Sequence, residues 1–301
     1  YNIFQHRNLF VDAFIGGRFR GLDFENATVA NRGKVTLIIP GLGLDLNRVN
    51  AYSAIFGNLT AEHAAPLGTY DQYSFAFGGG LGRAQTDPRW WVLKFSGGVS
   101  HYLEPLLFPS AWRDPSSASS SRLSHEISLG GRGQYAFGSR LIPQSSQVMG
   151  GLYSVRGFPQ GVAVGDNVYV GSFEYRFHLP RALPIQPRPV HLPWIGDFRV
   201  APQQVYGRPD WDLIFRAFVD AGKSTRNRPK LGAGPEYDQT LVGVGLGLEF
   251  VFRGNLRARV DWGRGIYQKT DVYLDSGQVL TERDSDIDDD GEFYFLFEVV
   301  W

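Results

Sequence analysis

Apolar side chains alternate with small or charged ones along much of this chain, and the alternation limits the possible folds more than any other feature. In residues 241–252, bulky apolar residues occupy every second position, and three glycines and Glu249 occupy most of the positions between them. Successive side chains of a β-strand point to opposite faces of a sheet, so this segment has one apolar and one small or charged face. The same pattern recurs in residues 168–179, 212–222, 255–265 and 292–301. The pattern predicts an all-β protein with antiparallel strands.

The two faces of these strands suit lipid on one side and water on the other. A soluble antiparallel sheet also alternates, but bulky apolar residues at five or six successive outward positions, opposed by charges and glycines, are typical of a transmembrane β-barrel. Glycine accounts for 37 of the 301 residues and aromatic residues for 14%, and no apolar run is long enough for a transmembrane helix. A transmembrane antiparallel β-barrel over residues 1–301 is therefore predicted, with a soluble β-sandwich as the alternative.

Less regular strands are predicted in the first half of the chain, which brings the readable total to about twelve. They cover residues 8–20, 35–47, 49–59, 73–83, 90–103 and 123–137. Residues 252–255 form a tight turn, whereas residues 223–239 and 267–290 are long and polar. In outer-membrane barrels the tight turns are periplasmic and the long loops are external, so residues 138–166 should form an external loop.

The same count of strands places the proline-rich residues 181–210 on the periplasmic side. A connection of this length is unusual there, since periplasmic turns are short. The segment is interpreted as an ordered plug or a partner-docking segment, and a disordered turn is the alternative.

Charge and motif content argue against several functional classes. Basic and acidic residues both number 30, so no basic face indicates a nucleic-acid partner, and the chain has no cysteine for a disulfide. The six histidines have no metal-ligand spacing, and no nucleophile elbow or phosphate loop is present, so neither an enzyme nor a cofactor is expected.

One acidic segment near the C-terminus has the D-x-D-x-D-G spacing of a calcium loop, at Asp286, Asp288 and Asp290. The glutamate that such loops carry at their twelfth position is missing, because Phe297 stands there. A weak calcium site and an acidic, solvated external loop are therefore the two interpretations.

One short segment breaks the alternation. Residues 150–158, GGLYSVRGF, place an arginine inside an apparent loop. A guanidinium can bind a carboxylate through two parallel hydrogen bonds, and Gly157 lets the backbone turn sharply and approach a wall. Inward glycines at 243, 245 and 247 would leave room on that wall. The alternative is an arginine solvated on a surface loop.

The segment Val155, Arg156, Gly157 and Phe158, the stretch GVAVGDN and the strands after it resemble the superfamily of outer-membrane assembly factors and two-partner secretion transporters (BamA, FhaC and ShlB types). FRAFVDAGK and LVGVGLGLEF are most similar to the ShlB/FhaC/HecB branch of hemolysin secretion and activation. The resemblance covers residues 123–301. It implies a barrel of about sixteen strands in the bacterial outer membrane, with residues 138–166 folded back into the lumen. The family also carries POTRA domains, and none is expected within this chain.

The resemblance also implies roles for individual residues. The family's motif arginine pairs with an acidic residue on a lumen-facing strand, a position that Asp220 matches, and Glu249 is a second candidate. Further charged residues are expected to face the lumen, namely Glu174, Arg176, Arg216, Arg257, Arg259 and Asp261. The C-terminal signal for barrel insertion corresponds to Phe293, Phe295, Phe297, Val299 and Trp301.

The function that the resemblance implies is export of a partner exoprotein across the outer membrane, with membrane lipid and lipopolysaccharide around the barrel. One alternative is a BamA-type insertase, whose clients are nascent outer-membrane proteins. Another is a non-transporting porin or a structural barrel within a larger envelope complex.

Overall fold

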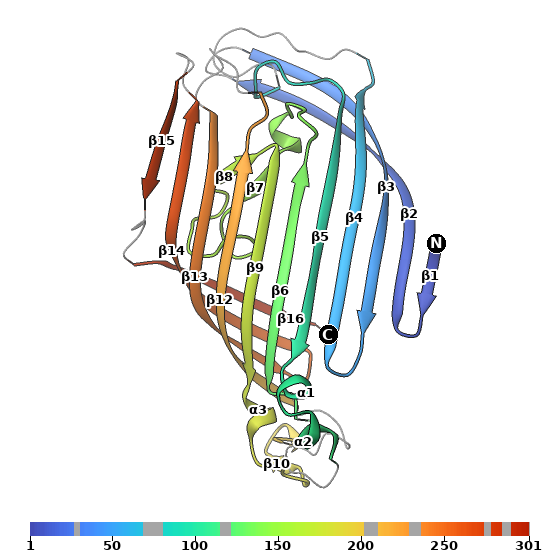
Figure 1. Ribbon diagram of the computed structural model, residues 1–301, viewed down its shortest axis with the longest axis vertical. Coiled ribbons are helices and arrows are strands. Elements are labelled where there is room, and N and C mark those ends of the chain that lie inside the picture. The colour runs from blue at the N-terminus through green and yellow to red at the C-terminus, as the bar shows by residue number, and fades with distance from the viewer. Residues whose placement is uncertain are drawn as a thin grey trace.

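A computed structural model of the chain describes residues 1–26, 31–68, 81–114, 122–201, 210–228, 236–273, 278–284 and 290–300. Its main feature is one twelve-stranded antiparallel sheet, so the prediction of an all-β antiparallel fold is confirmed (Figure 1). The strands are β1 (Asn2–His6), β2 (Leu9–Asn26), β3 (Asn31–Val49), β4 (Ser53–Pro66), β5 (Trp90–Tyr102), β6 (His125–Tyr135), β9 (Asn167–His178), β12 (Trp211–Thr225), β13 (Glu236–Phe252), β14 (Leu256–Tyr273), β15 (Val279–Asp284) and β16 (Glu292–Val299). Neighbours in the sheet follow the chain order, except that β15 and β16 both pair with β14.

The smaller elements lie at the two ends of the sheet and on one of its faces (Figure 1). They are the helices α1 (Glu104–Leu107), α2 (Pro109–Arg113) and α3 (Leu179–Ala182), a 3-10 turn (Pro143–Ser145), and the ribbons β7 (Gln147–Met149) with β8 (Ala163–Gly165) and β10 (Val190–Leu192) with β11 (Gly196–Phe198). We call the end with the β13–β14 turn the turn end and the opposite end the loop end. No helix within the described ranges is long and apolar enough to span a membrane.

The two faces of the sheet differ in chemistry. Along β12, Arg216, Phe218 and Asp220 are buried on one face, while Phe215 and Val219 are 46% and 45% exposed on the other. We call these the inner and the outer face. Apolar side chains exposed on the outer face include Ile15, Phe19, Leu42, Leu59, Leu129, Phe173, Leu246 and Phe295.

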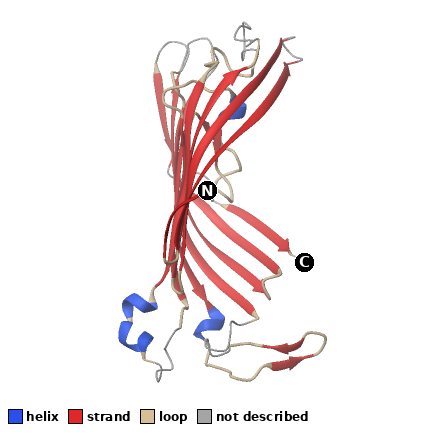
Figure 2. Cartoon of the chain, turned by 90° about the vertical axis from the view of Figure 1, so that its right-hand side faces the viewer, coloured by secondary structure: helices blue, strands red, loops and turns tan. Residues whose placement is uncertain are grey.

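The sheet is open in this structure. No strand among the described residues pairs with the outer edge of β1, and its first and last strands do not hydrogen-bond to each other. Figure 2 shows a strong twist, with the C-terminal strands diverging from the rest. The predicted closure into a barrel is therefore not seen.

Several predicted strand boundaries are wrong, because the prediction ended each strand where its apolar run ended. The strands continue through polar residues: β14 reaches Tyr273 and pairs there with β15, so residues 267–290 are not one long loop. Similarly, β12 ends at Thr225 and β13 begins at Glu236, so both ends of the predicted loop 223–239 belong to strands. β1 was not predicted.

Of the predicted strand 73–83, residues 73–80 lie outside the described ranges, and residues 81–83 are a turn. The predicted strand 49–59 corresponds to β4, which begins at Ser53.

Apolar side chains fill the space between the inner face and residues 136–166. At the loop end, Leu81, Leu141 and Ile142 pack against inner side chains of β3, β4 and β5. Nearer the middle of the sheet, Met149, Val155 and Phe158 form a second cluster with side chains of β9 and β13. The loop is thus packed on the sheet instead of being solvated.

Leu246→Lys tests whether the outer face contacts lipid. Leu246 lies in the middle of β13 and is 61% exposed. A lysine at the bilayer midplane costs about 2–4 kcal/mol, so we expect that loss in the free energy of unfolding, measured by urea titration in lipid vesicles. The control is Tyr135→Lys at the end of β6, where the cost falls to about 0–1 kcal/mol. Equal effects of the two variants would contradict a lipid-facing surface.

Candidate functional site

The segment with the unusual arginine lies in the connection between the two strands of the short β7–β8 ribbon. Gln147–Met149 pairs with Ala163–Gly165, and the chain between them descends along the inner face (Figure 1). The Gly157 backbone has a φ of +92°, and a Cβ there would collide with the Arg264 backbone. This position therefore requires glycine both for its conformation and for its contact with β14.

Arg156 binds three carboxylates that come from three different strands. Its Nε and Nη2 atoms donate to Asp220 at 2.6 and 2.9 Å, which is a two-point contact. Its Nη1 atom donates to Glu174 and to Asp261, each at 3.1 Å. Arg156 is 3% exposed and Asp220 and Asp261 are 0% exposed, so all these charges are removed from water. The alternative of a solvated arginine is wrong.

Three further contacts hold the guanidinium and its partner Asp220 in place. Its central carbon lies 3.4 Å from the centre of the Phe218 ring, a cation–π geometry. The Arg156 backbone N–H donates to Asp220 at 3.1 Å, and the Ser172 hydroxyl donates to the other Asp220 oxygen at 2.6 Å. Burial would lower the pKa of Arg156, but Asp220, Glu174 and Asp261 outweigh it and raise that pKa above its ordinary value.

Glu249, the second predicted partner, does not contact Arg156. Its carboxylate lies 3.6 Å from Arg216 and accepts a bond from Arg257 at 2.7 Å. Alternation correctly placed Glu249 on the inner face but could not give its neighbour, which depends on the register between β12, β13 and β14. Its position puts Glu249 at the border of the charged cluster.

The other predicted inward charges surround the Arg156 cluster. Arg216 donates to Glu174 at 2.6 Å and to Asp261 at 3.3 Å. Arg176 also binds Glu174, and Arg259 binds Asp261. Glu174 and Asp261 thus each have several cationic partners.

Asp220 differs from the other acids in the cluster. Among the described residues, its cationic partner is Arg156, and its remaining hydrogen-bond donor is Ser172. Removal of Arg156 would leave Asp220 without a charge partner, while Glu174 keeps Arg216. The Arg156–Asp220 pair is therefore the contact on which the position of the loop depends most.

The glycines of the inner wall have two different roles. A Cβ at Gly243 would collide with the Arg156 carbonyl oxygen, and one at Gly263 would lie 2.8 Å from the Gly157 nitrogen. Gly245 and Gly247 instead leave space for Phe218 and Asp261. Of the three glycines expected to leave room on the wall, Gly243 leaves it for the loop itself, and Gly245 and Gly247 leave it for side chains of the wall.

Tyr294 joins the last strand to the loop, a role that sequence reasoning missed. Its hydroxyl accepts the Gly157 N–H at 3.0 Å and donates to the Phe158 carbonyl at 2.8 Å. Alternation on β16 already placed Tyr294 opposite the apolar face. No further signal in the sequence connects it to residues 155–158.

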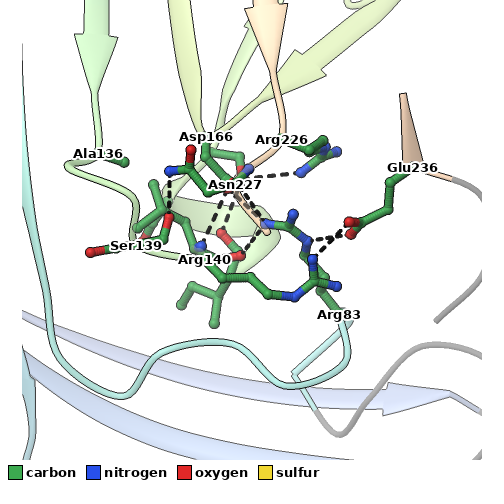
Figure 3. Close-up of polar contacts among 12 residues, drawn as sticks. Arg83, Ala136, Ser139, Arg140, Asp166, Arg226, Asn227 and Glu236 are labelled. Carbon is green, nitrogen blue, oxygen red and sulfur yellow. Dashed lines mark hydrogen bonds and ion pairs between the residues drawn. The ribbon is translucent and has the colours of Figure 1, made fainter. Parts of the chain in front are cut away.

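A second buried ionic cluster lies at the loop end (Figure 3). Arg83 donates to Asp166 at 2.7 Å and to Glu236 at 2.8 Å, and Arg140 donates to the other Glu236 oxygen at 2.7 Å. The Asn227 backbone N–H donates to Asp166 at 2.8 Å. Burial would lower the pKa of Arg83, but Glu236 and Asp166 outweigh it and raise that pKa.

This second cluster was not predicted, because its members come from segments with no periodic pattern. Arg83 and Glu236 are separated by 153 residues of the chain. Asp166 belongs to the stretch GVAVGDN, whose acidic character was the available signal. The cluster holds the base of the 138–166 loop, whereas the Arg156 cluster holds its tip.

The remaining predicted residues lie apart from these clusters. Phe293, Phe295, Phe297 and Val299 are exposed on the outer face, and Trp301 lies outside the described residues. Asp286 and Asp288 also lie outside them, and the Asp290 carbonyl accepts a bond from the Trp262 indole at 3.2 Å. Within the described ranges, no group of three or more acidic or histidine side chains is placed to hold a metal ion.

A cavity of about 290 Å³ lies beside Arg156. Small residues of β5, β6 and β9 line one side of it, among them Gly97, Gly130 and Ser172, and residues 152–154 of the loop line the other. The loop tip therefore leaves part of the inner wall uncovered.

Comparison with solved structures finds chains of similar fold. The fold is similar to that of CdiB from Escherichia coli. The TM-score is 0.58 and the sequence identity is 12%, over 99% of this chain and 43% of the CdiB chain. This chain thus spans less than half the length of CdiB. No protein-family model and no curated protein matches the sequence.

Arg156→Ala should release the loop tip. Removing one partner of a buried ion pair costs about 3–5 kcal/mol, because the remaining charge stays buried. We expect the amide hydrogen exchange of residues 150–158 to become faster in Arg156→Ala because the loop tip is less firmly held. Arg156→Lys should restore only part of the protection from exchange, since lysine cannot make the two-point contact. Arg257→Ala is the control, with a half-exposed side chain and an expected cost below about 1 kcal/mol. Similar exchange in both alanine variants would refute the assigned role of Arg156.

Gly243→Ala should displace the loop without removing any charge. The added Cβ would overlap the Arg156 carbonyl oxygen, and overpacking of this kind costs about 1–3 kcal/mol. The Arg156 and Gly157 amides should then exchange faster. Gly21→Ala is the control, because a Cβ there meets no atom within 4 Å. Unchanged exchange in Gly243→Ala would show that the loop does not rest on this wall.

Proposed function

We propose that this chain forms the wall and the gating loop of an outer-membrane protein-translocation pore of the two-partner secretion type. The observation that carries the proposal is the packing of residues 150–158 on the charged inner face through Arg156 and Asp220. The fold is similar to that of CdiB, a two-partner secretion transporter. The ShlB/FhaC/HecB branch remains a proposal based on the sequence motifs.

The distribution of side chains supports a place in the outer membrane. Exposed apolar residues cover the outer face, as contact with lipid requires, and ionised groups gather on the inner face. Membrane lipid and lipopolysaccharide are the proposed neighbours of the outer face. An exported polypeptide is the proposed partner of the inner face.

Closure of the pore requires partners for both edges of the sheet. In lipid, each unpaired backbone N–H or C=O costs several kcal/mol, so an open edge cannot persist there. We propose that further strands pair with β1 and β16 to complete a barrel. The intact mass of the protein in its native membrane locates them: a mass well above 33.6 kDa places them on the same polypeptide, and a mass near it places them on another chain.

On this proposal, the loop position described above is the closed state of the gate in the completed barrel. A polypeptide crossing along the inner face must first displace the loop tip, which breaks the two-point contact with Asp220. Glu174 and Asp261 then retain Arg216, so the cluster keeps most of its charge balance. Opening therefore breaks the Arg156–Asp220 pair and exposes the buried side chains of Val155 and Phe158, which suits a gate that a substrate must open.

Replacement of Arg156 by alanine in the native host tests the proposed transport. We expect one secreted protein to fall at least tenfold in the culture medium, measured by quantitative mass spectrometry, while the barrel remains assembled in the outer membrane. Arg257→Ala should leave secretion unchanged. Normal secretion in Arg156→Ala would contradict the proposal.

Two other outcomes would redirect the assignment. Depletion of the protein followed by a general loss of outer-membrane proteins would favour the insertase. Small-solute uptake that does not depend on Arg156 would favour a porin.

A further inference from the structure

The β10–β11 ribbon is a separate feature at the turn end of the sheet. Val190 pairs with Phe198, His191 with Asp197 and Leu192 with Gly196. Figure 2 shows the ribbon projecting from the end of the sheet. The Arg156 cluster makes no use of it, and the expectation of an ordered plug does not apply to a ribbon that lies outside the inner face.

The residue at its tip, Trp194, is strained and completely exposed. Its relative exposure is 104%, and its backbone φ is +72°, a conformation that is rare for bulky residues. Pro193 precedes it, and the Ile195 N–H donates to the Leu192 carbonyl at 3.3 Å, which closes a turn. Glycine or asparagine normally occupies such a position after proline. A strained backbone that presents an indole to its surroundings indicates that the indole itself is needed.

The ribbon is held firmly against the sheet. The Phe198 ring stacks on Phe252, with centroids 6.0 Å apart and an angle of 15°. The Arg253 guanidinium donates to the Asp197 carbonyl at 3.0 Å and to the Ile195 carbonyl at 3.4 Å. The position of Trp194 is therefore fixed relative to the β13–β14 turn.

The ribbon continues the apolar outer face past the end of the strands. Phe252 follows Leu246 and Leu248 on the outer face of β13, so the Phe198–Phe252 stack extends this surface. Val190 and Ile195 on the ribbon are themselves 43% and 39% exposed. An apolar belt that ends in an exposed tryptophan is typical of the boundary between membrane and water.

Basic side chains accompany the ribbon. Arg188, Arg199 and Arg253 are exposed around it. Arg199 pairs with Asp210 at 2.9 Å, and Arg253 donates to carbonyls of the ribbon. Arginine binds phosphate groups well, and basic residues near a membrane are attracted to anionic lipids. Indole and guanidinium groups together fit the phospholipid headgroup layer.

We propose that the β10–β11 ribbon is a membrane-interface anchor, with Trp194 inserted among phospholipid headgroups at the turn end of the sheet. The inference rests on the proposed membrane location of the chain. It adds that the β10–β11 ribbon is the segment that contacts the headgroup layer. Through Phe252 and Arg253, the anchor fixes the turn between β13 and β14, the two strands that form the wall beneath the loop.

The chain has no cysteine, so a single introduced cysteine carries a fluorescent label at one site. Labels at Val190→Cys, which keeps Trp194 and is 43% exposed, and, as a water-exposed control at the same end, Ser110→Cys are compared in vesicles of phosphatidylglycerol and of phosphatidylcholine. A spin label on the lipid headgroup should quench the Val190 label at least threefold more than the Ser110 label. Equal quenching at the two sites would overturn the anchor.

A third label separates this inference from the membrane proposal. Phe295→Cys lies on the outer face, and a spin label deep in the acyl chains should quench it strongly. Quenching at Phe295 without quenching at Val190 refutes the anchor alone. No quenching at Phe295 refutes the membrane location itself, and the anchor with it.

A second variant tests the indole without risk to the turn. Trp194→Gly suits the positive φ, so the ribbon should keep its fold. With a label at Val190→Cys, removal of the indole should reduce headgroup quenching several-fold. Unchanged quenching would show that Trp194 does not hold the ribbon at the membrane.

Stronger quenching in phosphatidylglycerol than in phosphatidylcholine would support recognition of anionic lipid, and a label quenched by neither lipid would refute the anchor.

Discussion

The buried contact between Arg156 and Asp220 is the interaction on which the inner architecture depends. A buried ion pair is a weak source of net stability, because desolvation of both charges offsets their attraction. Its effect here is positional: a misplaced loop would leave Asp220 buried and uncompensated, so alternative loop positions are costly. Glu174 and Asp261 support this by retaining Arg216, which keeps the rest of the cluster nearly independent of the loop. The pair therefore selects one loop position without being required for the fold of the sheet.

The sheet makes that contact possible by removing side chains from its inner wall. Glycines on β13 and β14 let the loop backbone approach the strands, with the Arg156 carbonyl against Gly243 and the Gly157 nitrogen near Gly263. Close approach in turn brings Gly157 within reach of the Tyr294 hydroxyl on β16. Four successive strands, β12, β13, β14 and β16, thus act on one short segment, through a carboxylate, open space and a hydroxyl.

The sequence predicted those parts of the site that depend on local alternation and missed those that depend on distant segments. Asp220, Glu174 and Asp261 face inward because strand parity determines their face, and parity is readable within each strand. Register between strands is not readable in this way, and Glu249, the second candidate partner of Arg156, does not contact it. The Arg83–Glu236 contact joins residues without any pattern, across 153 positions. Strand ends were misplaced because polar residues continue the strands after the apolar runs stop.

The two ionic clusters act on opposite ends of one loop, and apolar packing connects them. Val155 and Phe158 lie beside Arg156 and pack with Met149, which belongs to the β7 strand nearer the loop base. Movement of the tip alone would expose these apolar side chains, while movement of the whole loop would also break the Arg83–Asp166 contact. Apolar packing therefore opposes movement of the tip, and the Arg83–Asp166 ion pair also opposes movement of the whole loop. On the proposed function, an exported polypeptide displaces the loop by replacing both kinds of contact, with apolar side chains in place of Val155 and Phe158 and a basic side chain in place of Arg156.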